Sequence, residues 1–148
     1  MDSAISKIVT GIDFAIRTGA VPTSTVTSLL NVEPTRAFDQ GDVYVGRERL
    51  GTTFHEVERA RPWGVWHFCS SCFINTNSIE EHALFILAKF EPLRDAIQTL
   101  IDGQQCAVVI TIWYVGRDGF FVSSATVARL ASICEQIGIT CWDHGDEE

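Results

Sequence analysis

The strongest constraint on the fold is the segment 78–115, where a long amphipathic helix runs directly into the most apolar part of the chain. Ser78 and Glu81 have the spacing of a capping box, so we expect the helix to begin there. Apolar residues follow this cap at helical spacing, namely Ile79, Ala83, Ile86, Leu87, Phe90, Leu93, Ile97, Leu100 and Ile101. Pro92 suits the first turn of a second helical segment, and Gly103 is expected to end it.

The segment that follows this helix predicts a strand in the interior of a sheet. Residues 106–115 read Cys-Ala-Val-Val-Ile-Thr-Ile-Trp-Tyr-Val, so apolar side chains occupy both alternating faces. A strand with one face in water alternates between apolar and polar residues. Apolar residues on both faces are typical of a strand that is covered on both sides.

The remaining elements are shorter and together predict an α+β fold. We expect half-buried strands over 8–17 and 63–71, helices over 23–30 and 124–137 (the second ended by Gly138), and short strands over 43–45, 120–122 and 139–142. They indicate a single compact domain over residues 1–148, with a mixed or mainly antiparallel sheet and helices packed on one face. Residues 1–7 are expected to be an irregular lead-in, and 143–148 an acidic tail.

Residues 31–62 are the least regular part of the chain. Pro34, Asp39 and Gly41 are turn residues, and arginine and glutamate are closely mixed after Gly46. One interpretation is a solvated loop with a few exposed ion pairs. The other is a ligand-facing loop held by a rigid scaffold, which the unusual length of the segment favours.

Composition and charge restrict the classes of partner. The 148 residues carry 11 Lys and Arg against 19 Asp and Glu, a net charge of −8, which disfavours nucleic acid. An acidic surface suits solubility, the commoner interpretation, or steering toward a basic protein partner. No apolar run approaches the ~20 residues that span a bilayer, and the first residues lack the features of a signal peptide. We therefore expect a cytoplasmic protein that does not contact the membrane. An odd number of scattered cysteines, five, is not a disulfide framework.

Two groups of residues are candidates for chemistry. Cys69, Cys72, Cys141 and His144 form two pairs with the x₂ spacing of a zinc site. Residues three apart in a strand point to opposite faces, so incidental cysteines are the favoured interpretation, and we expect no metal or other cofactor. His82 is expected to be a surface or half-buried histidine near a helix start rather than a catalytic base. The common catalytic and phosphate-binding motifs are absent from the sequence.

Several short segments resemble the domain of unknown function 4279 family. They are Leu29-Leu-Asn-Val-Glu-Pro-Thr-Arg36 with Gly41-Asp42, then Gly64-Val-Trp66, Ile79-Glu-Glu-His82, Phe90-Glu-Pro92 and Phe120-Phe-Val-Ser-Ser124. The likeness spans about residues 8–143, with Asn31 where the family usually has glycine. The resemblance implies a small, free-standing bacterial protein with no assigned activity. A shared binding site in such a family would involve Thr35, Arg36, Gly41, Trp66 and His82.

Two functions compete. The first is a non-catalytic protein-binding module, immunity-like or antitoxin-like, that neutralises a basic partner; it is suggested by the acidic charge and the lack of catalytic motifs. The second is a small-ligand-binding protein or enzyme that uses the 34–42 loop with Trp66 and His82 around a cleft. We favour the first, and expect the second to fail if those side chains lie on different sides of the fold.

Overall fold

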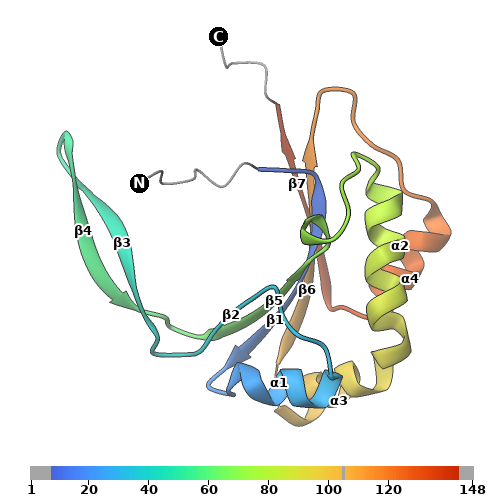
Figure 1. Cartoon of the computed structure of the whole chain (residues 1–148), viewed down its shortest axis with the longest axis horizontal. Helices are drawn as coiled ribbons and strands as arrows, with labels where there is room; N and C mark the ends of the chain where they lie inside the picture. Colours follow the sequence, from blue (N-terminus) through green and yellow to red (C-terminus); the bar gives the residue numbers. More distant parts are fainter. Residues whose placement is uncertain (1–7, 105, 144–148) are drawn as a thin grey trace.

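The computed structural model describes residues 8–104 and 106–143 and contains one five-stranded sheet, one two-stranded sheet and a layer of helices (Figure 1). The elements in chain order are β1 (Gly11–Gly19), α1 (Thr23–Leu30), β2 (Arg36–Phe38), β3 (Val43–Leu50), β4 (Thr53–Ala60), β5 (Gly64–Cys69), η1 (Ser70–Cys72), α2 (Ile79–Phe90), η2 (Glu91–Leu93), α3 (Arg94–Gln104), β6 (Ala107–Val115), α4 (Ser124–Ala131) and β7 (Gln136–Trp142). The expected lead-in and most of the expected acidic tail lie outside the described residues. No helix in the described part of the chain is long and apolar enough to cross a membrane.

The five-stranded sheet has the order β2-β5-β1-β6-β7 and is mixed, as the sequence predicts. Its first four strands pair antiparallel, whereas β6 and β7 are parallel. All four α-helices lie on one side of the sheet (Figure 1). Ile12, Phe14 and Ile16 of β1 point to that side and are at most 1% exposed, which confirms the predicted alternation of this strand. The core therefore lies between one face of the sheet and the helices.

The predicted start of α2 is confirmed, with one difference in its cap. The Ser78 side chain accepts a hydrogen bond from the Glu81 backbone N–H. The Ser78 backbone N–H donates to Thr76 Oγ1 rather than to the Glu81 side chain, so only half of the capping box forms. Pro92 lies in the short turn η2 between α2 and α3. Gly103 lies inside the last turn of α3 and does not end it.

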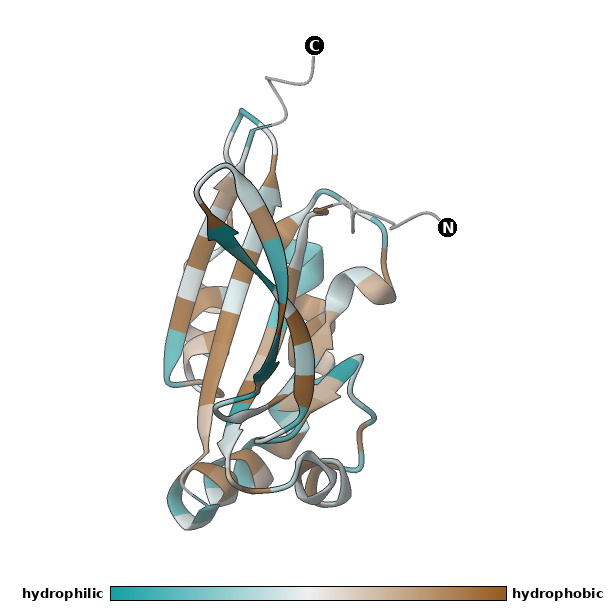
Figure 2. Ribbon diagram, turned by 90° about the vertical axis from the view of Figure 1, so that its left-hand side faces the viewer, coloured by the Kyte–Doolittle hydropathy of each residue, from teal (hydrophilic) through white to brown (hydrophobic). Residues whose placement is uncertain are grey.

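The largest departure from the sequence prediction is the segment 46–60: the strand expected over 43–45 extends to Leu50 and pairs with a second strand, so that 43–60 forms a regular hairpin. Strands β3 and β4 pair from Val43↔Ala60 to Leu50↔Thr53, and the hairpin projects away from the body on the side opposite the helices (Figures 1 and 2). We call this hairpin the arm. Its loop is two residues long and begins at Gly51, whose φ of +65° suits the first position of a hairpin turn. The sequence does not show these strands clearly, because arginine and glutamate on both sides of each strand replace the apolar–polar alternation that identifies a strand.

The base of the arm is held to the body by stacked side chains. The Arg61 guanidinium lies between two aromatic rings, 4.0 Å from the centre of the Phe38 ring and 3.9 Å from that of Tyr44. The Gly41 N–H donates to Arg61 O, and the Arg61 N–H donates to Asp42 O. These contacts fix the direction in which the arm leaves the sheet.

The last third of the chain differs from its prediction in two places. Residues 120–122 form no strand, and α4 ends at Ala131, well before Gly138, which lies within β7. A helix over 124–137 would have placed Val127, Leu130 and Ile137 on one buried side, which the structure contradicts. Leu130 is buried, Val127 is 43% exposed, and Ile137 packs against the core from β7 rather than from a helix. Strands β6 and β7 are parallel, and such a pair needs a crossover connection, which α4 supplies.

Candidate functional site

The side of the five-stranded sheet opposite the helices is left without a covering layer. We call it the open face; it carries Asp13, His67 and, on β6, an outward row of Ala107, Val109, Thr111, Trp113 and Val115. Every residue of this row is half-buried, and only Thr111 is polar. The sequence predicts that both faces of this strand are covered. Within the described residues the helices cover one face only (Figure 1).

A small polar cluster lies on the open face, where Asp13 of β1 meets two side chains of β5. His67 Nδ1 lies 2.9 Å from Asp13 Oδ2, and Cys69 Sγ lies 3.3 Å from Asp13 Oδ1. The strand register explains this, because Asp13 pairs with Cys69 while His67 is the next residue of β5 on the same face. A carboxylate accepts about four hydrogen bonds, so both Asp13 oxygens retain lone pairs for a donor from outside.

The cluster is a fixed polar patch rather than a nucleophilic centre. Desolvation by burial, followed by the charge of Asp13, raises the pKa of the Cys69 thiol to about 12. At neutral pH the thiol therefore stays protonated and donates its hydrogen to Asp13, whereas a nucleophilic cysteine needs a lowered pKa. The carboxylate also lies between the histidine and the cysteine. A histidine that activated the cysteine would have to lie between the other two.

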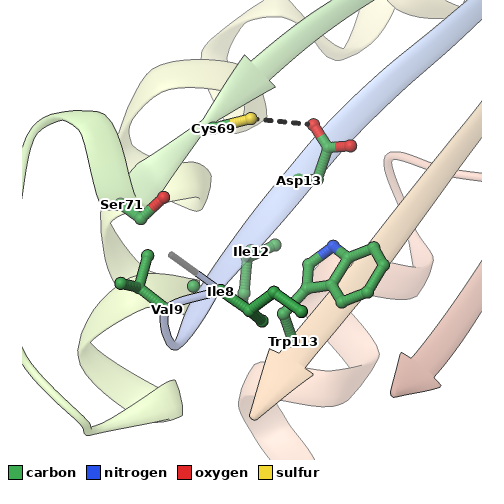
Figure 3. Close-up of a pocket in the computed structure, with 8 residues that line it drawn as sticks. Ile8, Val9, Ile12, Asp13, Cys69, Ser71 and Trp113 are labelled. Carbon is green, nitrogen blue, oxygen red and sulfur yellow. Dashed lines mark hydrogen bonds between the residues drawn. The ribbon is translucent and has the colours of Figure 1, made fainter. Parts of the chain in front are cut away.

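A shallow cleft of about 300 Å³ opens beside this cluster (Figure 3). It is lined by Ile8, Val9, Gly11, Ile12, Asp13, Cys69, Ser71 and Trp113. Asp13 and Cys69 lie at one end, and Ile8 and Val9 at the other, with the Trp113 ring along the side (Figure 3). Apolar walls, an aromatic ring and one carboxylate match a lysine or arginine side chain, whose methylene stem packs on apolar surface while its charge meets the carboxylate.

Two of the five residues expected in a shared site lie beside this cluster. Thr35 Oγ1 accepts the Cys69 backbone N–H and donates to His67 O, which joins the start of β2 to β5. Arg36 is exposed and pairs with His67 across the two strands. Gly41 lies farther away, in the turn at the base of the arm, where its φ of +87° favours glycine.

Trp66 and His82 lie on the other side of the sheet, in the core. Both are 0% exposed. The Trp66 indole N–H donates to Thr27 Oγ1 at 3.1 Å. The expectation of a surface or half-buried His82 is therefore wrong, because its ring is enclosed at the start of α2. The five residues do not share one cleft.

His82 takes part in a buried polar network. Its Nε2 lies 2.9 Å from Thr76 O and its Nδ1 lies 2.7 Å from Ser70 Oγ. A carbonyl only accepts, so a neutral ring carries its proton on Nε2 and its Nδ1 accepts the Ser70 hydroxyl proton. Ser70 Oγ in turn accepts the Ile12 N–H at 2.8 Å. Ser70 and His82 are both 0% exposed, so this serine–histidine pair has no access to a substrate.

The structure separates Cys141 from Cys69 and Cys72 of the possible zinc set. Cys69 lies on the open face, Cys72 is exposed in η1, and Cys141 lies on β7, while His144 is outside the described residues. β5 and β7 are three strand positions apart, or roughly 14 Å. The described residues also contain no cluster of three or more His, Cys, Asp and Glu with metal-binding geometry.

Sequence reasoning missed Asp13 and Trp113 as site residues. Asp13 is one polar residue in an alternating strand, and only pairing with β5 brings His67 and Cys69 to it. Trp113 did carry a signal, since it belongs to the second apolar face of residues 106–115.

Comparison with known proteins places the chain in a family but supplies no function. No curated protein and no solved structure matches it. A family model described as "Domain of unknown function (DUF4279)" matches residues 8–144, nearly the whole chain. This match confirms the resemblance drawn from the short motifs: the chain belongs to the DUF4279 family.

Proposed function

We propose that this protein is a non-catalytic protein-binding module that holds its partner on the open face of the sheet. The observation that carries the proposal is the outward row of β6, which is apolar at four of its five positions yet has no covering layer within the described residues. A sheet face that stays in water normally carries polar residues. A partner that covered this row would remove its apolar surface from water, and this burial would stabilise the complex.

The proposed partner is a basic protein of the same cell. The net charge of −8 would accelerate its approach, and the cleft beside Asp13 would receive one lysine or arginine side chain. A module that covers a basic protein in this way would act as an immunity or antitoxin protein does, by blocking the partner's working surface. The Trp113 ring beside the cleft would add a cation–π contact.

The chemistry of the described residues supports a non-catalytic role. The Cys69 thiol stays protonated at neutral pH, and the Ser70–His82 pair is enclosed in the core. The alternative is a small-ligand site, and the cleft of about 300 Å³ lies at the lower end of the volumes of such sites. A protein partner would place a basic side chain in this cleft and would also cover the apolar row of β6 with its own surface. A small ligand would fill the cleft and leave the row exposed.

The experiment is co-purification from the cells that make the protein, with three baits: the unchanged chain, Trp113→Ala and Leu84→Ala. Leu84 is the control because it is 44% exposed on α2, on the helix side, so its substitution removes an exposed apolar side chain away from the open face. We expect one basic protein to be retained by the unchanged chain and by Leu84→Ala at low salt. Trp113→Ala should lose it, and 0.5 M salt should weaken retention because steering is screened. Equal retention by Trp113→Ala, or no basic protein at all, would refute the proposal.

A further inference from the structure

We propose that the arm is a self-association surface, on which a second copy of this chain docks through the side that carries Val43. The cross-strand register defines this side: Val43, Val45, Arg47 and Arg49 of β3 lie opposite Ala60, Glu58, Glu56 and Phe54 of β4. We call it the Val43 face. It is distinct from the open face, so this inference does not depend on the proposed function.

The Val43 face carries three apolar side chains that the single chain leaves exposed. Val43, Val45 and Phe54 are 67%, 63% and 65% exposed. A two-stranded hairpin alone is at best marginally stable in water, and this one has no other layer over the Val43 face within the described residues. Arg47, Glu56 and Glu58 form no ion pair within the described part of the chain. The face thus has both apolar and charged groups that lack partners.

The pattern of charge on this face matches a second copy. The basic residues Arg47 and Arg49 lie on β3, whereas the acidic residues Glu56 and Glu58 lie on β4. Consider two arms stacked through their Val43 faces and related by a two-fold axis that runs parallel to the strands. Each residue then keeps its position along the arm, and β3 of one copy lies over β4 of the other. Arg47 then meets Glu56 of the second copy, Arg49 meets the ring of Phe54, and Val45 packs against the methylene stem of Glu58, whose carboxylate gains no cation. Each contact occurs twice.

Several other symmetric arrangements of two arms bring like charges together. Antiparallel edge pairing of β3 with β3 centred on Arg47, or of β4 with β4 centred on Glu56, places like charges directly opposite each other, which destabilises a sheet. A two-fold axis across the arm stacks β4 on β4 and brings Glu56 and Glu58 close to their copies. The axis along the arm instead pairs opposite charges, Arg47 of each copy with Glu56 of the other.

The body of the protein leaves the Val43 face free. Tyr44 lies on the opposite side of the ribbon, and its ring packs through Arg61 onto Phe38 of the body. Successive side chains of a strand point to opposite sides, so Val43 and Val45 point away from this contact at the base of the arm. An eight-residue strand is only about 26 Å long. The buried area is therefore small, and we expect a weak, concentration-dependent dimer.

The test is sedimentation velocity of the whole chain at roughly 5–500 µM, a range that brackets the dissociation constant of a weak interface. The same measurement is made on variants with reversed charges on each side of the arm. We expect Arg47→Glu and Glu56→Arg each to weaken dimerisation about tenfold or more, because each change acts twice in a symmetric dimer. The double variant R47E/E56R restores the opposite-charge contact and should regain most of the affinity. The matched control is E48R/R59E, which reverses an ion pair on the other side of the ribbon and should leave the affinity unchanged.

Each outcome decides the proposal. A chain that stays monomeric at all these concentrations overturns it. A dimer that is indifferent to Arg47→Glu, or that R47E/E56R fails to restore although the variant gives the circular dichroism spectrum of the unchanged chain, shows that the Val43 face is not the interface. Loss of dimerisation in E48R/R59E would place the contact on the other side of the arm. Co-purification on the open face can fail or succeed independently of all these results.

Discussion

Ser70 joins three segments of the chain through one hydroxyl group, so its removal should cost far more than the loss of one oxygen atom suggests. It follows β5, accepts the N–H of Ile12 on β1 and donates to His82 at the start of α2. The substitution Ser70→Ala leaves the Ile12 N–H and His82 Nδ1 buried without a partner. Each unsatisfied buried group costs about 1–3 kcal/mol. We expect the free energy of unfolding to fall by about 2–6 kcal/mol, a large part of the 5–15 kcal/mol typical of a domain.

The measurement is urea unfolding followed by tryptophan fluorescence, with Ser71→Ala as the matched control. Ser71 is the next residue, is half-buried and makes no side-chain hydrogen bond within the described residues. With a slope of about 2 kcal/mol per M of urea, Ser70→Ala should lower the midpoint by about 1–3 M. Ser71→Ala should change the free energy of unfolding by less than about 0.5 kcal/mol. Equal effects of the two substitutions would refute the assignment of this network.

Three further predictions concern the strands around the open face. Thr18 Oγ1 is buried and has no hydrogen-bond partner within the described residues. Thr18→Val should therefore raise the thermal unfolding temperature by an amount equivalent to about 1 kcal/mol, and a lower unfolding temperature would contradict this. A Cβ at Gly64 would fall on Thr18 Oγ1 and lie 3.2 Å from Phe38 O, so Gly64→Ala should lower stability to urea by about 1–3 kcal/mol, and an unchanged midpoint would show that the backbone yields freely. Iodoacetamide at pH 8, followed by peptide mass spectrometry, should label the exposed Cys72 and spare Cys69, whose pKa is raised from 9.0 to about 12; rapid labelling of Cys69 would contradict the assignment. Because the fold favours the neutral Cys69 thiol, its contribution to the free energy of unfolding is complete below about pH 9 and is lost as the pH approaches 12.

The elements that the sequence predicted correctly are those whose own residues determine them. Ser78 and Ser123 carry the side-chain caps of α2 and α4, and in each case the hydroxyl accepts a backbone N–H three residues ahead. Alternation identified β1 because apolar residues face the helices and polar ones the open face. Asn31 adopts the left-handed conformation, with φ of 54°, at the predicted end of α1. Local patterns of this kind need no knowledge of the remaining chain.

The failures arise where distant strands decide the outcome. Cys134 and Ile137 continue the helical spacing of α4, but pairing with β6 draws Ile137 into a parallel strand instead. The arm was missed because both of its sides are in water, so arginine and glutamate hide the period of two that identifies a strand. Asp13 and His67 are 54 residues apart and meet only through the register of β1 with β5.

We expect the cleft on the open face to receive a basic side chain, and an NMR titration tests this expectation. The probe is N-acetyl-arginine methylamide added at millimolar concentration to isotope-labelled protein, with the uncharged citrulline analogue as the matched ligand. We expect saturable shifts of the Trp113 indole and the Asp13 amide with arginine, and their loss both with citrulline and in Asp13→Asn. Shifts of equal size with citrulline, shifts that persist in Asp13→Asn, or no shift at Trp113 would contradict it.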